Sequence, residues 1–372
     1  MTAKSRVSIV RCANYKQPEV EGAVKTAVEL LGGIEKFVKP DSRVLIKPNL
    51  LSARMPEDGV DTHPEVVRAV ARLVKAITPH VLVGDSPGGW GINDIDEVYE
   101  KSGMKRVCLE ENIKLVKFDK AVMLEGFPFA SVIGEVDAII SIPKLKSHVA
   151  TILTGAVKNM FGTVVGLHKA QCHLRAPSPE KLADILAHVY SLVKPALSIM
   201  DGIVGMEGEG PAAGSLRNFG IILAGGDGVS LDAVFATLAG IDPCKVPTTY
   251  EAQKRGCGIA DLNRIEIAGE RLKDVKIAHF KLPKTSILFN LSKPIFNAGV
   301  KAVKFSPHIL KKECNRCGLC FKICPKNAVK KIDTGEYVVN TKECIRCFCC
   351  YEVCPDKAIT LKKSLLAKVI MR

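Results

Sequence analysis

Residues 314–325, CNRCGLCFKICP, and residues 344–355, CIRCFCCYEVCP, decide how the C-terminal part of this chain folds. Each segment has the spacing C-x2-C-x2-C-x3-C-P, a recurrent way to hold an iron–sulfur cluster by cysteine thiolates. In the two-cluster form of this motif, the fourth cysteine of each run ligates the cluster of the other run. The spacing therefore predicts two [4Fe–4S] clusters. The predicted ligands are Cys314, Cys317, Cys320 and Cys354 for the first cluster, and Cys344, Cys347, Cys350 and Cys324 for the second.

Two other uses of these eight cysteines fit the sequence less well. Disulfides are disfavoured because the N-terminal residues, MTAKSRVSIVRC, contain no apolar signal core, and intracellular thiols stay reduced. Zinc sites favour two CxxC pairs separated by a longer loop. Cys349, beside the predicted ligand Cys350, has no place in the motif. We interpret it as a buried spectator, with a spare thiol near the cluster or a rival ligand as the alternatives.

Residues 308–361, in which both motifs are complete, resemble a bacterial-type two-cluster ferredoxin. The chain has 372 residues, which is too long for a ferredoxin alone and predicts two or three domains. We expect an α/β domain over residues 1–283, a linker over residues 284–307, and the small α+β ferredoxin-like domain over residues 308–372.

The formal net charge of +14 is concentrated near the C-terminus, where residues 301–372 contain 16 basic and 6 acidic residues. Lysines placed around negatively charged clusters are suited to steering an acidic redox partner protein, although a solvated surface explains many of them. This distribution, with only 5% aromatic residues, argues against a nucleic-acid partner. No run reaches the roughly 18 apolar residues of a membrane span. We therefore expect a cytoplasmic protein.

Upstream of the cysteine motifs, apolar runs alternate with amphipathic segments. RVLIK (43–47), VLVGD (81–85) and VDAIISIP (136–143) are typical of buried strands, and PEVVRAVARLVKAI (64–77) is typical of a helix. This alternation predicts an α/β fold, a mostly parallel sheet with helices on both faces. Ligands of such sheets bind beyond the carboxyl ends of the strands. Polar residues follow these strands: Lys47 and Asn49, Asp85 and Ser86, Lys144 and Lys146.

Six segments, KPNLL, GDSPGG, PKLKSH, TGAVKNMFG, MDGIVGMEGEGP and GVSLDAVFATLAG, resemble in content and order the DUF362 family of uncharacterised proteins, many of which have a ferredoxin-like tail. This resemblance implies a family but no reaction. The segment SHVATILTGAVKNMFG is also faintly similar to the His…Thr-Gly-Gly-x-Lys region of nickel-pincer lactate racemases, although Ala156 and Val157 break that pattern.

Residues 142–173 bring many chemically active side chains into one glycine-containing segment that follows a strand. Lysines in such a segment are suited to an anionic substrate or a cofactor phosphate, and histidines to proton transfer or metal binding, although surface lysines and structural histidines are the ordinary alternatives. The residues that we expect to bind or protonate a substrate are Lys144, Lys146, His148, Lys158 and Asn159, with Lys169, His168 and His173 as further candidates.

The sequence thus predicts an iron–sulfur oxidoreductase that passes single electrons to a substrate or cofactor in the α/β domain. The alternative is a non-catalytic electron carrier or scaffold whose α/β domain docks a partner enzyme. Two further alternatives are a hydrolase or isomerase with structural clusters and a nucleic-acid sensor, whose binding would depend steeply on salt. The second cofactor or metal of the α/β domain, if it has one, is not specified by the sequence.

Overall fold

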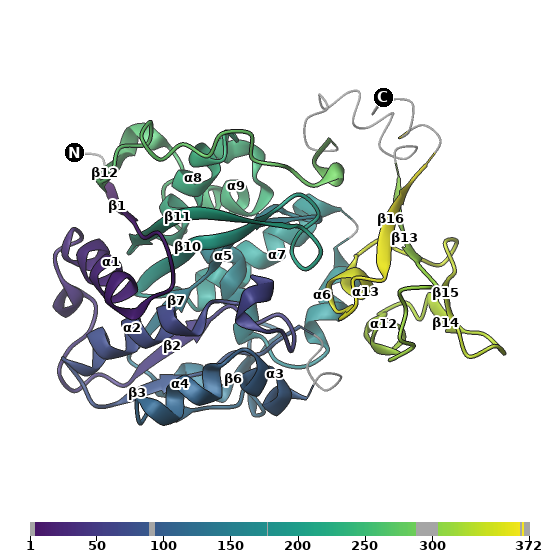
Figure 1. Ribbon diagram of the computed structural model, residues 1–372, viewed down its shortest axis with the longest axis horizontal. Coiled ribbons are helices and arrows are strands. Elements are labelled where there is room, and N and C mark those ends of the chain that lie inside the picture. The colour runs from purple at the N-terminus through teal and green to yellow at the C-terminus, as the bar shows by residue number, and fades with distance from the viewer. Residues whose placement is uncertain (1–3, 89–93, 177, 288–303, 365–366, 368–372) are drawn as a thin grey trace.

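The computed structural model describes residues 4–88, 94–176, 178–287, 304–364 and 367. Its larger part is an α/β domain built on one ten-stranded sheet, as predicted (Figure 1). The strands and helices of this domain are β1 (Ser5–Arg11), α1 (Gln17–Glu29), β2 (Val44–Pro48), α2 (Pro64–Lys75), β3 (Val81–Val83), α3 (Ile95–Lys101), α4 (Met104–Glu110), β4 (Lys114–Leu115), β5 (Ala121–Leu124), β6 (Phe127–Ala130), β7 (Ala138–Ile142), β8 (Lys144–His148), β9 (Ile152–Thr154), α5 (Ala156–Asn159), α6 (His168–Arg175), α7 (Pro179–Leu192), β10 (Leu197–Glu207), β11 (Ser215–Gly225), α8 (Gly228–Leu238), α9 (Pro247–Lys254) and β12 (Ile265–Gly269).

The strand order along the sheet is β12-β1-β11-β10-β7-β2-β3-β4, and β8 and β9 extend from β10. The neighbours β10, β7, β2, β3 and β4 run parallel, whereas β11 is antiparallel to both β1 and β10. Strand β2 lies near the centre and is buried along its whole length. Because neighbouring parallel strands end at the same edge, the residues after β2, β3 and β7 gather at one edge of the sheet.

Helices cover both faces of this sheet. Alternate residues of a strand face opposite sides, and in β2 apolar residues on both sides are buried. Val44 and Ile46 of β2 belong to the hydrophobic core that includes α1 and α2. Leu45, between them, belongs to the core that includes α7 and α8. The apolar run that predicted a strand therefore reflects burial on both faces.

In its described part, residues 304–364 and 367, the C-terminal domain has two short antiparallel strand pairs and two short helices. Its elements are β13 (Phe305–Ile309), α12 (Leu319–Ile323), β14 (Val329–Lys331), β15 (Tyr337–Val339), α13 (Cys349–Glu352) and β16 (Ile359–Lys363). Strand β13 pairs with β16, and β14 pairs with β15. The domain thus begins by Phe305, inside the linker that the sequence predicted over residues 284–307. Residues 288–303 of that predicted linker lie outside the described residues.

The two domains contact each other through α13 and its flanking residues, and Figure 1 shows α13 beside α6. The Arg54 guanidinium donates a hydrogen bond to the carbonyl oxygen of Cys354 at 2.9 Å, and the Tyr351 hydroxyl donates to the carbonyl oxygen of Glu209 at 2.5 Å. These bonds hold one cysteine-rich turn against the edge of the sheet. In the described part of the chain, no helix combines the length and apolar character that crossing a bilayer requires.

Candidate functional site

The eight motif cysteines surround two small cavities in the C-terminal domain. Cys314, Cys317, Cys320 and Cys354 line one of them. Cys324, Cys344, Cys347 and Cys350 line the other. A cubane takes one thiolate on each iron, so its ligands surround a space instead of converging on a point. The donor set of each cavity, four cysteine sulfurs drawn from both motifs, fits one [4Fe–4S] cluster.

The backbone around the two cavities repeats with an interval of 30 residues. Arg316 and Arg346 both have positive φ angles, 63° and 60°. The amide of Ala328 donates to Cys324 Sγ at 3.1 Å, and the amide of Ala358 donates to Cys354 Sγ at 3.3 Å. Backbone donors to sulfur stabilise thiolate charge, which is a further way in which these loops suit cluster ligation. Among the described residues, no three His, Cys, Asp or Glu side chains converge on a point suited to a single metal ion.

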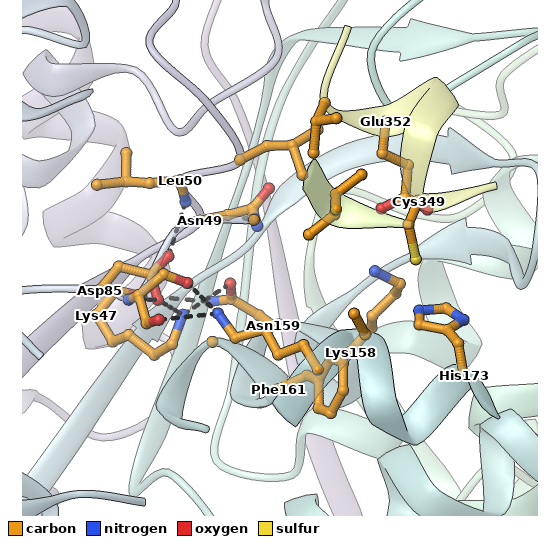
Figure 2. A pocket seen from close by; sticks show the side chains of 18 residues that line it. Lys47, Asn49, Leu50, Asp85, Lys158, Asn159, Phe161, His173, Cys349 and Glu352 are labelled. Atoms are coloured by element: carbon orange, nitrogen blue, oxygen red, sulfur yellow. Dashed lines mark hydrogen bonds and ion pairs between the residues drawn. The ribbon is translucent and has the colours of Figure 1, made fainter. Parts of the chain in front are cut away.

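A third cavity, of about 100 Å³, lies between the two domains. One wall comes from the ends of β2 and β3, a second from α5 and α6, and a third from Ile323 and α13 of the C-terminal domain. Figure 2 shows Lys158, His173, Cys349 and Glu352 at one end of this interdomain cavity, and Lys47, Asp85 and Asn159 at the other. The cavity therefore places strand-end polar residues opposite the turn that carries the cysteine ligands.

A buried ion pair forms the floor of the interdomain cavity. Lys47 Nζ lies 2.7 Å from Asp85 Oδ1, and both side chains are almost fully buried. Burial lowers the pKa of Lys47, and Asp85 opposes that shift. Gly162 permits this arrangement, because a Cβ there would lie 2.2 Å from Asp85 Oδ1 and 2.5 Å from Lys47 Nζ. Lys47 also bonds to Asn159 Oδ1 at 3.2 Å, which ties the floor to α5.

Helix α5 carries Lys158 and Asn159, two of the predicted site residues. Its first turn is held by Asp232 of α8, which accepts hydrogen bonds from the amides of Ala156 at 2.6 Å and Val157 at 3.0 Å. Gly155 leaves room for the carboxylate, since a Cβ there would lie 2.1 Å from Asp232 Oδ1. Lys158 is half-buried, and among the described residues its ammonium group has no ion-pair or hydrogen-bond partner. It is therefore available to a ligand.

Helix α6 contributes Lys169 and His173 to the same cavity. The Lys169 ammonium donates to the carbonyl oxygen and, at 3.0 Å, the hydroxyl of Ser86. Burial lowers the pKa of Lys169 to about 7, against the opposing effect of Asp85. Burial also lowers the pKa of His173 to about 4, so His173 is neutral at physiological pH.

Glu352 of α13 and His148 of β8 meet across the domain boundary. His148 Nε2 lies 3.3 Å from Glu352 Oε1, and neither atom has a hydrogen bond to another described residue. The amide of Ala150 donates to His148 Nδ1 at 3.1 Å, so neutral His148 carries its proton on Nε2, the nitrogen that lies near Glu352. Burial, with Lys158 nearby, lowers the pKa of His148 to about 4. Burial disfavours the Glu352 carboxylate, but His148 and Lys158 more than offset this effect and lower its pKa to about 2.

The structure brings together only part of the predicted substrate site. Lys158 and Asn159 line the cavity, and His148 lies behind Glu352. Lys144 and Lys146 do not line it: Lys144 pairs with Asp201 at 2.7 Å, and Lys146 donates to the carbonyl oxygen of Val60 at 2.6 Å. Both lysines are fully buried within β8, where internal partners and not a ligand meet their charge. His168 lies on α6 without lining the cavity.

Two cavity residues were missed or undervalued in the sequence. Glu352 stands where the first motif has Lys322, and Cys349 stands where it has Leu319. These two differences between the motifs are the signal in the sequence that could have marked Glu352 and Cys349 as special. Their significance depends on the docking of α13 against the sheet edge, which neither motif specifies.

Comparison with known proteins gives the family of the α/β domain and the class of the C-terminal domain. Residues 44–237 match the model of the "Domain of unknown function (DUF362)". The chain belongs to the DUF362 family. Residues 306–355 match a 4Fe-4S dicluster domain, which gives this family member an iron–sulfur electron-transfer role. A thylakoid-associated protein of Synechocystis sp. is 35% identical over 257 residues, which cover 67% of this chain and 79% of that protein.

Two solved structures are similar to part of this DUF362 protein. The lactate racemase apoprotein of Thermoanaerobacterium thermosaccharolyticum has a TM-score of 0.41 and 13% identity over 65% of this chain. A structural-genomics protein of Thermotoga maritima has a TM-score of 0.35 and 15% identity over 66% of this chain. The match spans 58% and 60% of those two chains, less than two thirds of either.

Proposed function

We propose that this protein is an iron–sulfur oxidoreductase in which two [4Fe–4S] clusters accept electrons singly from an external donor and pass them to a small substrate in the interdomain cavity. The proposed ligands are Cys314, Cys317, Cys320 and Cys354 for one cluster, and Cys324, Cys344, Cys347 and Cys350 for the other. When bound, these clusters supply single electrons, and the α/β domain supplies the place where they are used.

The observation that carries this proposal is the short connection between the cysteine ligands and the interdomain cavity. Cys349 and Ile323 line that cavity, and each directly precedes in sequence a cysteine of the second cluster cavity. Val353 lines it too and precedes Cys354 of the first. A cavity walled by residues adjacent to cluster ligands suits electron delivery to whatever it binds.

The surrounding side chains suit the remaining tasks of such a reaction. Lys158 offers an uncommitted positive charge, and Asn159 is fixed by its amide nitrogen, which donates to Ser141 Oγ at 2.9 Å. His148 holds a proton on Nε2 beside Glu352, so the pair can retain or release a proton near a bound molecule. Docking of α13 limits the access of water to this space.

The test is anaerobic reoxidation of the reduced, cluster-loaded protein by a panel of small metabolites, followed through the visible absorbance of the clusters. We expect at least one compound to reoxidise the wild-type protein and to do so at least 10-fold more slowly with Lys158→Met, because the uncommitted charge is lost. Lys181→Met, which alters an exposed lysine on α7, is the matched control. Reoxidation by a partner protein alone, with every small molecule inert, would instead favour the non-catalytic carrier.

A further inference from the structure

We infer that the interdomain cavity binds a compact monoanion, whose charge is met by Lys158, and that Glu352 selects against dianions. This inference deepens the function proposed above by naming a chemical class of substrate. That the bound anion accepts electrons rests on that proposed function, whereas the existence of the binding site rests on the geometry of the cavity.

The size of the cavity limits the ligand to a few non-hydrogen atoms. Its volume of about 100 Å³ lies well below the roughly 300–1,000 Å³ typical of pockets that take drug-sized ligands or organic cofactors. A nucleotide, flavin or nicotinamide exceeds this volume. A short carboxylate or a comparably small oxyanion does.

The positive charges that line the cavity are not equally available. Lys47 is already paired with Asp85 at 2.7 Å, and Lys169 already donates to oxygen atoms of Ser86 and Pro87. Lys158 has no such bond among the described residues, and Figure 2 shows its ammonium group directed toward α13. A half-buried ammonium without a hydrogen-bond partner gains most from an anion placed beside it.

The negative charges set an upper limit on the charge of the ligand. The Asp85 carboxylate is balanced by Lys47, and the Glu352 carboxylate offsets one of the two remaining lysines. Below about pH 7, where Lys169 is charged as well as Lys158, the lining side chains together carry a net charge of +1, which a monoanion neutralises. A second negative charge on the ligand would face Glu352 without a compensating cation, and like charges in a buried site repel strongly.

Two polar groups on the walls give the ligand an orientation. Glu352 Oε1 lies 3.3 Å from His148 Nε2, so His148 of β8 helps to position that carboxylate at one end of the cavity. Asn49 also lines the cavity, and its side-chain oxygen has no hydrogen-bond partner among the described residues. The Asn49 side-chain oxygen is therefore free to accept a hydrogen bond from a donor group of a ligand whose charged end lies at Lys158.

Equilibrium dialysis of the oxidised, cluster-loaded protein tests this inference with three molecules of similar size. Labelled acetate is the monoanion, acetamide is its neutral analogue of the same shape, and oxalate is a dianion. We expect acetate to bind at one site per chain, at least 10-fold more tightly than acetamide and more tightly than oxalate. Equal binding of acetate and acetamide, tighter binding of oxalate, or no saturable acetate binding would overturn the inference.

Two substitutions test the roles of Lys158 in binding the monoanion and of Glu352 in rejecting the dianion. Lys158→Met should weaken acetate binding at least 10-fold, whereas Lys181→Met should leave it unchanged. Glu352→Gln should raise the affinity for oxalate relative to acetate at least 10-fold, an effect that mere loosening of the fold would not produce. These measurements involve no electron transfer. Acetate binding without reoxidation by any small molecule would reject the proposed function and retain this site, and the reverse pattern would do the opposite.

Discussion

Cys349 occupies a distinctive position, since it lines the interdomain cavity while its neighbour Cys350 lines the second cluster cavity. Its equivalent in the first motif is Leu319, which is not a ligand type. We therefore expect Cys349→Ala to retain about eight iron atoms per chain, as two cubanes require. Cys317→Ala, which removes one of four sulfurs from the first cavity, should reduce the iron content to about four.

Iron and acid-labile sulfide analysis of anaerobically purified variants checks this prediction. Cys317→Ala should also lower the stability of the C-terminal domain, because a domain of this size has little core apart from its metal. A loss of iron in Cys349→Ala would identify Cys349 as a ligand and would require a different assignment of the second set.

The predictability of individual residues from the sequence depended on how local their partners are. The cysteine pattern is informative because spacing within one short segment limits which sulfurs can surround one cavity. Lys144 and Lys146 were assigned to a ligand site because they follow a predicted strand in a glycine-containing segment, but β8 continues the fold there and buries both. Glu352 was missed because its partner His148 lies 204 residues away in sequence.

Helix α5, which presents Lys158, depends on one buried carboxylate from α8. Asp232 accepts the amide hydrogens of Ala156 and Val157, one on each oxygen. Asp232→Asn keeps the size of the side chain but provides a single acceptor, so one buried amide loses its partner. We expect a cost of about 1–3 kcal/mol in the local stability of α5. Amide hydrogen exchange of residues 156–159, measured by mass spectrometry, reports this change.

The same substitution should alter the pH dependence of that stability. Burial raises the pKa of Asp232 from 3.8 to about 7 in the folded protein, although its two amide donors oppose the shift. Between about pH 4 and pH 7 the folded state therefore holds one proton more than the unfolded state, and the stability contributed by Asp232 falls as pH rises, by at most about 1.4 kcal/mol per pH unit. Asp232→Asn should remove this decrease. A wild-type opening free energy of α5 that rises over this range would contradict the prediction.

Whole strands and helices were predicted where burial on both faces imposes an apolar run, as in β2 and β7. The polar segment that became β8 gave no such signal, because its two lysines are buried against internal partners, Asp201 and the carbonyl oxygen of Val60. The short helix α5 likewise depends on Asp232, 76 residues further along the chain than Ala156. Elements of this kind cannot be predicted from local sequence, because the contacts that stabilise them form only in the tertiary fold.

The molecule as a whole carries its charge unevenly, and a groove in the C-terminal domain concentrates the positive part. This basic groove is lined by Lys311, Lys312 and Lys362, together with His308 and one carboxylate, Glu313. Tyr337 lines both the groove and the first cysteine-lined cavity, so a protein docked in the groove lies close to that cavity. Lys311 is paired with Glu336 at 2.6 Å, whereas Lys312 and Lys362 have no ion pair among the described residues.

We expect electrons from an acidic redox protein to enter at this groove. The rate of reduction by such a donor should fall steeply between about 0.01 M and 1 M salt, because the screening length shrinks from about 30 Å to about 3 Å. The double variant Lys312→Glu/Lys362→Glu should lose at least 10-fold in rate at low salt, since steering accelerates association by about 10–1,000-fold. Stopped-flow absorbance measures these rates.

A matched double variant separates the groove from net charge. Lys25→Glu/Lys39→Glu makes the same change in total charge at exposed positions of the α/β domain and should slow the donor far less. Small chemical reductants, which need no docking, should reduce all three proteins at the same rate. Equal slowing by both double variants would show that overall charge, and not the groove beside the first cysteine-lined cavity, governs the encounter. A salt-independent rate would exclude electrostatic docking altogether, because screening by salt acts on any encounter that charges guide.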